Sequence, residues 1–475
     1  IIDMPAVVLK KKLSTERKFI WIKRKMDIQK SEIIRAMDLD GIGFIKEKKR
    51  YYPRNRTASH IIGFTDIDNR GLSGVEKMFD RYLRGIPGKF ILYTDANNHK
   101  IYKNKKEAIA GDTIVLTIDE YLQYVVEKEL EHVLEKYRAK AAVSIMMDPY
   151  TGKILALANK PDFNPNFPGK FDEARRRNRA VTDMYEPGST FKSILASAAL
   201  EEKIVRVNQR FDCSKGYIRV GGRRIRDAHR HGILTFQQII QKSSNVGAIQ
   251  VGALLGKKRY YRYMRAFGFG QKTGSGLPGE ISGFLAPPSR WSGLSLASMS
   301  IGQEIGITPL QLIRAYAAIA NGGLLLKPYI VSEILSPSGD IIKKFKPTVV
   351  RRVISRRTSE IMKNILKTVV QEGGTAVNAA IKGNAVAGKT GTAQMVDPKT
   401  KRYSRSKYVS SFIGFVPADR PKFVLIVVVF EPKGAIYGGV VAAPVFRSIA
   451  EQALAYLGVP IEEYDHQPKR QIVKR

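Results

Sequence analysis

Cysteine is almost absent from the sequence, since Cys213 is the only one among 475 residues. A lone cysteine cannot form a disulfide within the chain and offers no second thiol to a metal ion. The six histidines do not form the H-E-x-x-H pattern of a zinc enzyme. We therefore expect no metal and no cofactor. We also expect Cys213 to be buried or half-buried without a chemical role, and His229 and His231 to lie on the surface.

Long apolar runs are also lacking. The longest covers residues 423–429, whereas crossing a bilayer takes ~20 apolar residues. The chain starts with Ile, and no charged segment followed by an apolar one precedes the first domain, so no signal peptide is visible. We expect that a membrane anchor lay upstream of a trimmed start.

Acidic residues are scarce relative to basic ones. Lys and Arg number 80 against 43 Asp and Glu, which gives a formal charge of +37. Such a charge attracts polyanions, namely nucleic acid, anionic lipid headgroups or an acidic cell-wall matrix. The basic clusters are spread along the chain and none falls in a nucleic-acid-binding motif; they lie at 10–12, 46–50, 175–177, 223–224 and 356–357. We therefore expect mostly solvated surface charge and no nucleic-acid partner.

A chain of this length is usually divided between two domains. Residues 1–110 are basic and rich in short alternating stretches, with helical periodicity at 27–37 and 73–83, which predicts an irregular α+β domain. We place the domain boundary at Gly111-Asp112. The second domain is expected to span 111–465, followed by a basic tail at 466–475.

The second domain begins and ends with strand patterns. A strand-like run leads into Thr117-Ile-Asp-Glu120, a capping-box pattern before an amphipathic helix. Strands are predicted at 141–147, 153–158, 383–394, 408–416 and 422–430, and a closing helix at 442–457. Between the two groups lies a mostly helical stretch that includes a helix from Thr308-Pro309 to Asn321-Gly322. This pattern predicts an α+β fold whose sheet is assembled from both ends of the domain.

One segment of the helical stretch has the chemistry of a nucleophile. Glu186-Pro-Gly precedes Ser189-Thr-Phe-Lys192, which opens a helix. The free N–H groups at a helix N-terminus favour negative charge on the Ser189 oxygen. Lys192 follows at i+3 on the same face, and a desolvated lysine can serve as the base that a serine nucleophile needs.

The S-x-x-K spacing also occurs by chance, as at Ser404-Arg-Ser-Lys407, so it needs support. That support comes from Ser243-Ser-Asn245 and Lys389-Thr-Gly391, because S-x-x-K, S-x-N and K-T-G in this order are typical of penicillin-binding proteins and β-lactamases. A second K-T-G at 272–274 lies in a glycine-rich loop. We favour Lys389, because strands follow it and only there can a strand edge be offered to a peptide.

The sequence resembles the class B penicillin-binding proteins over most of its length. The resemblance is carried by N-R-A-V-T-D-M-Y-E-P-G-S-T-F-K at 178–192, S-S-N-V-G at 243–247, I-G-Q-E-I-G-I-T-P-L-Q-L at 301–312 and A-G-K-T-G-T-A-Q at 387–394. Upstream, G-F-T-D-I-D-N-R-G-L-S-G-V-E-K-M-F-D at 63–80 resembles their non-catalytic pedestal domain, and this match favours the division-specific member. The membrane anchor and the first pedestal motif of that family are not seen.

The resemblance implies the family's fold: an antiparallel five-stranded sheet flanked by helices, an all-helical subdomain and a preceding pedestal. It also implies a peptidoglycan D,D-transpeptidase that acts on stem peptides ending in D-Ala-D-Ala and is acylated by β-lactams. Such an enzyme sits in the bacterial cytoplasmic membrane at the division septum, with its catalytic domain on the outer face. A polytopic glycosyltransferase of the SEDS type and other division proteins would be its partners.

The same resemblance implies a role for each motif residue. Ser189 would attack the penultimate D-Ala carbonyl, Lys192 would take its proton, and the N–H groups of Ser189 and Thr392 would form the oxyanion hole. Ser243 would relay a proton to the leaving amine, and Asn245 would hold the substrate amide. Lys389 would keep the field positive, while Thr390 and Thr392 bind the terminal carboxylate beside the small Gly391.

Other functions stay open from the sequence. These are an elongation-specific transpeptidase, a D,D-carboxypeptidase or β-lactamase-like hydrolase, and an inactive scaffold that binds the cell wall. The N-terminal domain argues against a compact β-lactamase, and the complete set of motifs argues against an inactive scaffold.

Overall fold

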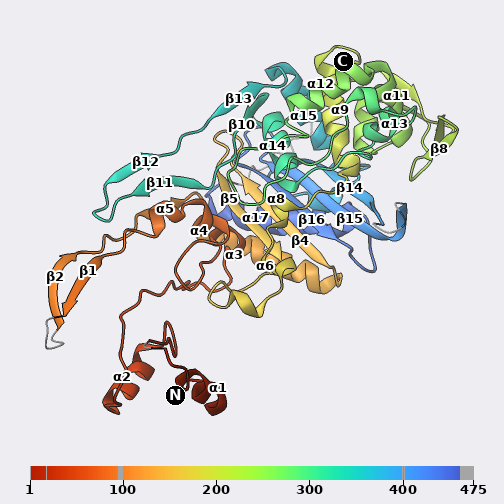
Figure 1. Cartoon of the computed structure of the whole chain (residues 1–475). Helices are drawn as coiled ribbons and strands as arrows, with labels where there is room; N and C mark the ends of the chain where they lie inside the picture. Colours follow the sequence, from red (N-terminus) through yellow and green to blue (C-terminus); the bar gives the residue numbers. More distant parts are fainter. Residues whose placement is uncertain (1, 18, 95–99, 398–399, 401, 461–475) are drawn as a thin grey trace, which may run out of the picture.

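A computed structural model of the chain describes residues 2–17, 19–94, 100–397, 400 and 402–460, and is shown in Figure 1. The tail expected at 466–475 lies outside these residues. Within the described ranges, no helix has both the length and the apolar character needed to pass through a membrane.

The centre of the molecule is a five-stranded sheet with the strand order β14-β15-β16-β4-β5, in which every neighbouring pair is antiparallel. Its strands are β4 (Ala141–Met147), β5 (Ile154–Lys160), β14 (Ala387–Val396), β15 (Tyr403–Val416) and β16 (Phe423–Phe430). β16 is central and every one of its residues is buried, as its uninterrupted apolar run requires. The predicted sheet from both ends of the domain is thereby confirmed.

β14 starts later than the strand predicted at 383–394. Residues 381–384 instead form a tight turn, with a bridge between Ile381 and Asn384 and a φ of +74° at Gly383. The turn depends on the positive φ that glycine adopts without strain, and the apolar pattern did not reveal it.

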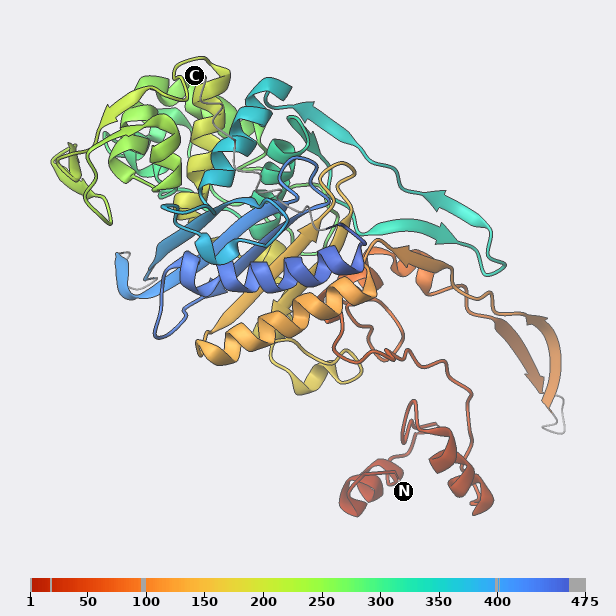
Figure 2. The ribbon, with the colours of Figure 1, turned by 180° about the vertical axis from the view of Figure 1, so that it is seen from behind.

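Two long helices cover one face of the sheet, α6 (Glu120–Lys136) and α17 (Ala443–Tyr456), and Figure 2 shows them side by side. The N-cap predicted for α6 at Thr117 is wrong: Asp119 caps the helix by accepting from the N–H of Leu122. Thr117 Oγ1 donates instead to the carbonyl of Ile154 at 2.6 Å, so this hydroxyl ties the helix start to β5.

The other face of the sheet is covered by α14 (Pro309–Ala320), which has the predicted Thr308 cap with Gln311 closing a capping box. Beyond it lies the helical subdomain (Figure 1), made of α9 (Lys192–Glu201), α10 (Phe236–Gln241), α11 (Asn245–Leu255), α12 (Lys257–Ala266), α13 (Ser295–Ser300) and α15 (Arg356–Thr368). The subdomain also contains short antiparallel pairs that the sequence analysis did not anticipate: β6 (Arg210–Asp212) with β9 (Ile233–Thr235), and β7 (Tyr217–Val220) with β8 (Arg223–Arg226).

The N-terminal part is an irregular α+β region. Its elements are α1 (Ala6–Leu13), α2 (Ile28–Ala36), α3 (Ser59–Ile62), α4 (Gly74–Met78), α5 (Asp80–Leu83), β1 (Lys89–Thr94) and β2 (Lys100–Lys106). Both views show α1 and α2 apart from the sheet, whereas α3 to α5 lie against it. The helix predicted at 73–83 is two short helices, α4 and α5, that meet at Phe79.

Smaller sheets connect and extend the domains. β3 (Thr113–Leu116) pairs with β11 (Val331–Leu335), which pairs with β12 (Ile341–Lys344), while β10 (Leu324–Leu326) pairs with β13 (Val349–Arg352). The remaining short helices are η1 (Pro168–Lys170), α7 (Glu173–Arg176), α8 (Arg179–Thr182), η2 (Gly188–Phe191), η3 (Pro288–Arg290), η4 (Val377–Ala379) and α16 (Gly438–Val441).

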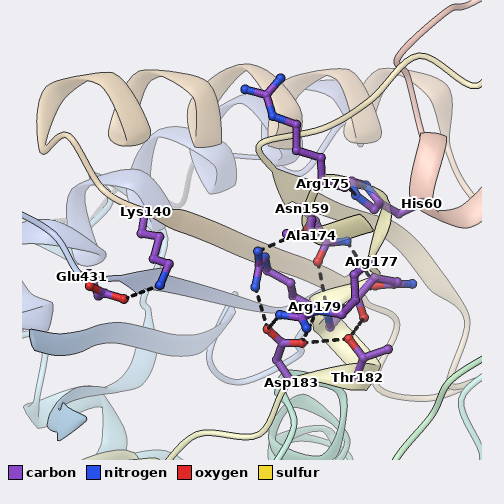
Figure 3. Close-up of polar contacts among 12 residues, drawn as sticks. His60, Lys140, Asn159, Ala174, Arg175, Arg177, Arg179, Thr182, Asp183 and Glu431 are labelled. Atoms are coloured by element: carbon purple, nitrogen blue, oxygen red, sulfur yellow. Dashed lines mark hydrogen bonds and ion pairs between the residues drawn. The ribbon is translucent and has the colours of Figure 1, made fainter. Parts of the chain in front are cut away.

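The contact between the N-terminal region and the sheet domain is polar as well as apolar. Figure 3 shows His60 of α3 beside α7, where His60 Nε2 lies 2.7 Å from the carbonyl oxygen of Arg175. Burial lowers the pKa of His60 to about 4, so the ring is neutral and donates this bond. In the same view Arg177 and Arg179 both pair with Asp183, which fixes the segment that leads to Ser189.

Candidate active site

The turn that carries Ser189 is held from two sides. Ser189 lies in η2, and Lys192 opens α9 directly after it, so the predicted helix start is present. On one side the N–H of Gly188 donates to the carbonyl of Gly302 at 3.0 Å. On the other, an ideal Cβ on Gly188 would lie 3.1 Å from the carbonyl oxygen of Thr392 in β14. The turn therefore sits between the 301–307 segment and the edge strand of the sheet.

Lys192 is fully buried and points at the S-x-N motif. Its Nζ donates to the carbonyl oxygen of Ser243 and to Asn245 Oδ1, each at 2.7 Å, and lies 3.4 Å from Ser243 Oγ. In the described part of the chain, no hydrogen bond joins Lys192 Nζ to Ser189 Oγ. The missing bond is compatible with Lys192 acting as a base for Ser189, because hydrogen bonds between such groups often tighten only when substrate binds.

Ser243 lies between two buried lysines. Lys389 Nζ, at the inner end of β14, donates to Ser243 Oγ at 2.9 Å and approaches Thr390 Oγ1 at 3.4 Å. Ser243 has a φ of +60°, a left-handed backbone conformation that is rare outside glycine and marks a constrained position. The structure thus brings four of the predicted residues together: Lys192, Ser243, Asn245 and Lys389.

Burial dominates the electrostatics of the two lysines. It lowers the pKa of Lys192 to about 7, an effect that the charge of Asp227 opposes. It also holds the pKa of Lys389 well below the usual range, and the neighbouring charge of Lys192 adds to this decrease. At neutral pH the two lysines together therefore favour a state with one positive charge over a state with two.

β14 is an edge strand, so alternate backbone groups along it are unpaired within the sheet. Thr390 is buried, with its Oγ1 2.9 Å from Thr375 Oγ1. Thr392 is half-buried, and its Oγ1 accepts from the N–H of Gly438 at 3.0 Å, which leaves its own proton free to donate. An added Cβ on Gly391 would lie 2.9 Å from the carbonyl oxygen of Pro187, so only glycine lets the strand approach the Ser189 turn this closely.

The two decoy motifs lie in different surroundings. Lys272 lies in the predicted loop, where its neighbour Thr273 is bound by the carboxylate of Glu280 rather than presented on a strand edge. Ser404 lies at the start of β15 and accepts from the N–H groups of Ser406 and Lys407.

Three residues of the site were missed from the sequence. Asp227 accepts from the N–H groups of Asn245 and Val246 and, at 2.8 Å, from Ser244 Oγ, so it holds the start of α11. Glu186 Oε1 accepts from the N–H of Glu304 at 2.9 Å and from Tyr403 Oη at 3.1 Å. Burial raises the pKa of Glu186. The position of Glu186 in the E-P-G-S segment was the available signal, whereas nothing local marks Asp227 or Tyr403.

Metal-ligating side chains do not gather here. Over the ranges that the structure describes, no three His, Cys, Asp or Glu side chains lie close enough together to hold a metal ion. Cys213 is buried beside Ser244, whose hydroxyl lies 3.6 Å from the sulfur.

Two family models divide the chain. Residues 142–451 match the penicillin binding protein transpeptidase domain, and residues 3–116 match the penicillin-binding protein dimerisation domain. The fold is that of this class of enzyme.

Individual relatives agree with the family models. Stage V sporulation protein D of Bacillus subtilis is 39% identical over 92% of this chain and 68% of its own length, and peptidoglycan D,D-transpeptidase FtsI of Escherichia coli is 35% identical over 93% and 73%. The crystal structure of penicillin-binding protein 3 from Mycobacterium tuberculosis complexed with ampicillin superposes with a TM-score of 0.78, at 32% identity, covering 89% of this chain and 92% of that one. The chain belongs to the class B penicillin-binding proteins.

Proposed function

We propose that Ser189 is the nucleophile of this peptidoglycan D,D-transpeptidase. The observation that carries the proposal is that Lys192, one helical turn after Ser189, and Lys389 both donate to Ser243. Lys192 also donates to Asn245, and the turn that holds Ser189 lies against the edge strand β14. A serine, a lysine with a lowered pKa and a peptide-binding strand edge are the parts that acyl transfer between peptides needs.

In the acylation step, Ser189 Oγ attacks the carbonyl of the penultimate D-Ala while Lys192 Nζ takes the hydroxyl proton. The N–H groups of Ser189 and Thr392 stabilise the oxyanion. The C–N bond then breaks, and the terminal D-Ala leaves as an amine after receiving a proton through Ser243. Because Ser243 Oγ accepts from Lys389, its own proton is free to move between Lys192 and the leaving nitrogen.

The remaining residues position the substrate. Asn245 holds the peptide amide, and Thr390 and Thr392, with the charge of Lys389, bind the terminal carboxylate next to Gly391. In the second step a side-chain amine of a neighbouring stem attacks the acyl-enzyme, forms the cross-link and returns the proton to Ser189.

We further propose a septal role, with the pedestal at 1–110, the catalytic domain at 111–465 and the protein attached to the cytoplasmic membrane with its catalytic domain outside. The pedestal motif at 63–80 and the E-P-G-S segment support this role. A SEDS-type glycosyltransferase and other division proteins would be its partners, and β-lactams its inhibitors.

Intact-protein mass after incubation with benzylpenicillin tests the nucleophile. The wild-type protein should gain one penicilloyl group, and Ser189→Ala should gain none while keeping its melting temperature, because only a hydroxyl is lost. Ser404→Ala is the matched control, since it removes the serine of the decoy S-x-x-K, and it should still be labelled. Labelling of Ser189→Ala would refute the assignment.

The lifetime of the adduct separates a transpeptidase from a hydrolase. Rapid deacylation needs a carboxylate base at the acyl carbonyl, but Glu280 is bound within its own loop by Thr273 and Ser275. Glu186 has a raised pKa and an oxygen that already accepts two hydrogen bonds. The adduct should therefore persist for minutes or longer after excess drug is removed, whereas recovery within seconds would favour a β-lactamase.

A further inference from the structure

The main chain between Ser189 and Lys192 makes a tighter turn than an α-helix does. The segment passes from the short helix η2 directly into α9, and the N–H of Lys192 binds the carbonyl of Ser189, a hydrogen bond that is one residue shorter than its α-helical counterpart. The direction of Ser189 relative to Lys192 therefore depends on how the backbone is held at the two residues between them, Thr190 and Phe191.

Thr190 is enclosed between this turn and the edge strand. It is fully buried, and its hydroxyl donates to the carbonyl of Pro187 at 2.8 Å, which ties it to the start of the turn. Its methyl group lies against β14, since an added Cβ on Gly391 would be 3.0 Å from Thr190 Cγ2. Thr190 is thus a residue at which the segment that carries Ser189 meets the strand edge.

The carbonyl of Thr190 is bound from α14, the helix that packs on β4 and β16. Tyr316 of α14 is fully buried, and its Oη lies 2.7 Å from the carbonyl oxygen of Thr190 and 2.8 Å from Ser193 Oγ. A phenol carries one proton and a carbonyl can only accept, so Tyr316 donates to Thr190 and accepts from Ser193. One hydroxyl therefore binds the chain directly after Ser189 and directly after Lys192.

These contacts need a tyrosine and not merely an aromatic ring. A hydroxyl in an apolar core costs free energy unless it is hydrogen-bonded, whereas a phenylalanine would fill almost the same space without that cost. Burial raises the pKa of Tyr316, so the phenol keeps the proton that it donates. Both bonds of the hydroxyl go to one short segment, residues 190–193. The hydroxyl is therefore matched to the backbone of the S-x-x-K motif.

We propose that Tyr316 is a positioning residue for acyl transfer: by binding the carbonyl of Thr190, its hydroxyl fixes the direction in which Ser189 faces a substrate on β14. The proposal rests on the proposed function, because it takes Ser189 as the nucleophile. Tyr316 is fully buried and acts through Thr190 without touching the substrate. Without the hydroxyl the turn relaxes, so Ser189 Oγ is less often in line with the carbonyl carbon that it attacks.

Tyr316→Phe tests the proposal, since it removes one oxygen atom and keeps the ring. Stopped-flow acylation over a range of benzylpenicillin concentrations separates the dissociation constant of the noncovalent complex from the first-order rate constant of acylation. The rate constant should fall about five- to tenfold, as expected from the loss of one buried hydrogen bond that aligns the nucleophile. The dissociation constant should change by less than about twofold, because the drug does not contact a fully buried side chain.

Tyr263→Phe is the matched control. The hydroxyl of Tyr263, a residue that is 8% exposed, donates to Glu202 Oε1 at 2.7 Å, and Glu202 caps the far end of the same helix, α9. Both variants lose a tyrosine hydroxyl that binds this segment, so both should show a similar small decrease in melting temperature. Only Tyr316→Phe should lose acylation rate, because only its hydroxyl binds next to Ser189.

The outcomes separate positioning from general loosening. An unchanged rate constant in Tyr316→Phe, or an equal loss in Tyr263→Phe, would overturn the proposal. So would a rise in the dissociation constant as large as the fall in rate, or a melting temperature far below that of Tyr263→Phe, since each indicates a merely structural role. If benzylpenicillin does not label Ser189 in the wild-type protein, the proposed function itself is wrong.

Discussion

At the scale of single residues, the site depends on two lysines that share one serine. Lys192 and Lys389 are both fully buried, and both approach Ser243 Oγ. Two ammonium groups in this position would repel each other in a medium that solvates charge poorly, so the neutral form of one of them is stabilised. Lys192 is the better base, because its pKa of about 7 lets it accept and return a proton at neutral pH.

The pH dependence of acylation follows from this pKa. Lys192 must be neutral to accept the proton of Ser189, so the acylation rate should rise with pH through about 7. Asp227 raises the pKa of Lys192, and Asp227→Asn should therefore move the midpoint to lower pH. Stopped-flow acylation by benzylpenicillin from pH 5.5 to 8.5 measures both midpoints. A rate that is flat across this range would exclude Lys192 as the base.

The same shift links pH to stability. The folded protein disfavours protonated Lys192, whereas the unfolded chain keeps it protonated up to its ordinary value of 10.5. Between about 7 and 10.5 the unfolded state binds more protons at this residue, so its contribution to stability increases with pH over that window.

The two K-T-G motifs give a paired prediction. Lys389→Ala should slow acylation by orders of magnitude, because it removes the charge beside Ser243 and the proposed carboxylate site. Lys272→Ala, in the exposed loop, should acylate at nearly the wild-type rate. Lys389→Met fills the same volume and should also be slow, which separates the loss of charge from a cavity. The reverse pattern would mean that Lys272 belongs to the site.

At the scale of elements, the close approach of three segments positions the nucleophile. The 301–307 segment pairs with 185–188 through the bridge between Tyr185 and Ile307 and through the bond from Gly188 to Gly302. β14 approaches the same turn from the other side at Gly391. The glycines at both contacts let the backbones pack directly against each other. A displacement of either segment therefore moves Ser189.

Gly302→Ala tests this packing. Gly302 has a φ of +78°, and an added Cβ would lie 2.0 Å from the carbonyl oxygen of Gly188, so the methyl group must push the Ser189 turn away. Gly222→Ala is the control, since Gly222 has a φ of +76° but no atom within 4 Å of the added Cβ. The rate of acylation by benzylpenicillin should fall at least tenfold for Gly302→Ala. Gly222→Ala should keep its acylation rate and lose only about 1–2 kcal/mol of stability through backbone strain. Similar acylation rates in both variants would show that strain, not contact, is what matters.

At the scale of the whole molecule, the N-terminal region and the sheet domain share a core. Ile61 and Val75 belong to the same apolar cluster as α6 and the central strands. Polar contacts reinforce the junction: Arg56 pairs with the buried carboxylate of Asp162 at 3.1 Å, and Asn166 binds the backbone of Tyr52. The two parts should therefore unfold together.

Ile61→Ala should lower the stability of the catalytic domain, although Ile61 lies far from Ser189 in the sequence. Removing a fully buried isoleucine side chain costs about 2–5 kcal/mol. The readout is residual penicillin labelling after a heat challenge, which reports on the catalytic domain alone. Ile33→Ala on α2 is the control, because Ile33 is 50% exposed and should not change the result. Equal heat resistance of both variants would mean that the junction does not couple the two parts.

The sequence by itself determined the features that depend on neighbouring residues. Apolar runs such as 423–430 predicted the central strands, because a strand buried on both faces must be apolar throughout. Thr308-Pro309 predicted the start of α14, since capping is a contact between residues three positions apart. The S-x-x-K segment predicted that Lys192 follows Ser189 on one helix, because the spacing alone sets that geometry.

Only the tertiary structure decided which distant groups meet. Thr117 had the better capping pattern, but the carbonyl of Ile154 takes its hydroxyl, so Asp119 became the cap. The hydrogen bonds of Asp227 to Ser244 and Asn245, and the bond between Tyr403 and Glu186, join residues that no local pattern relates. Residues that are far apart in the chain are brought together only by packing over long sequence separations, so no local pattern predicts which of these groups meet.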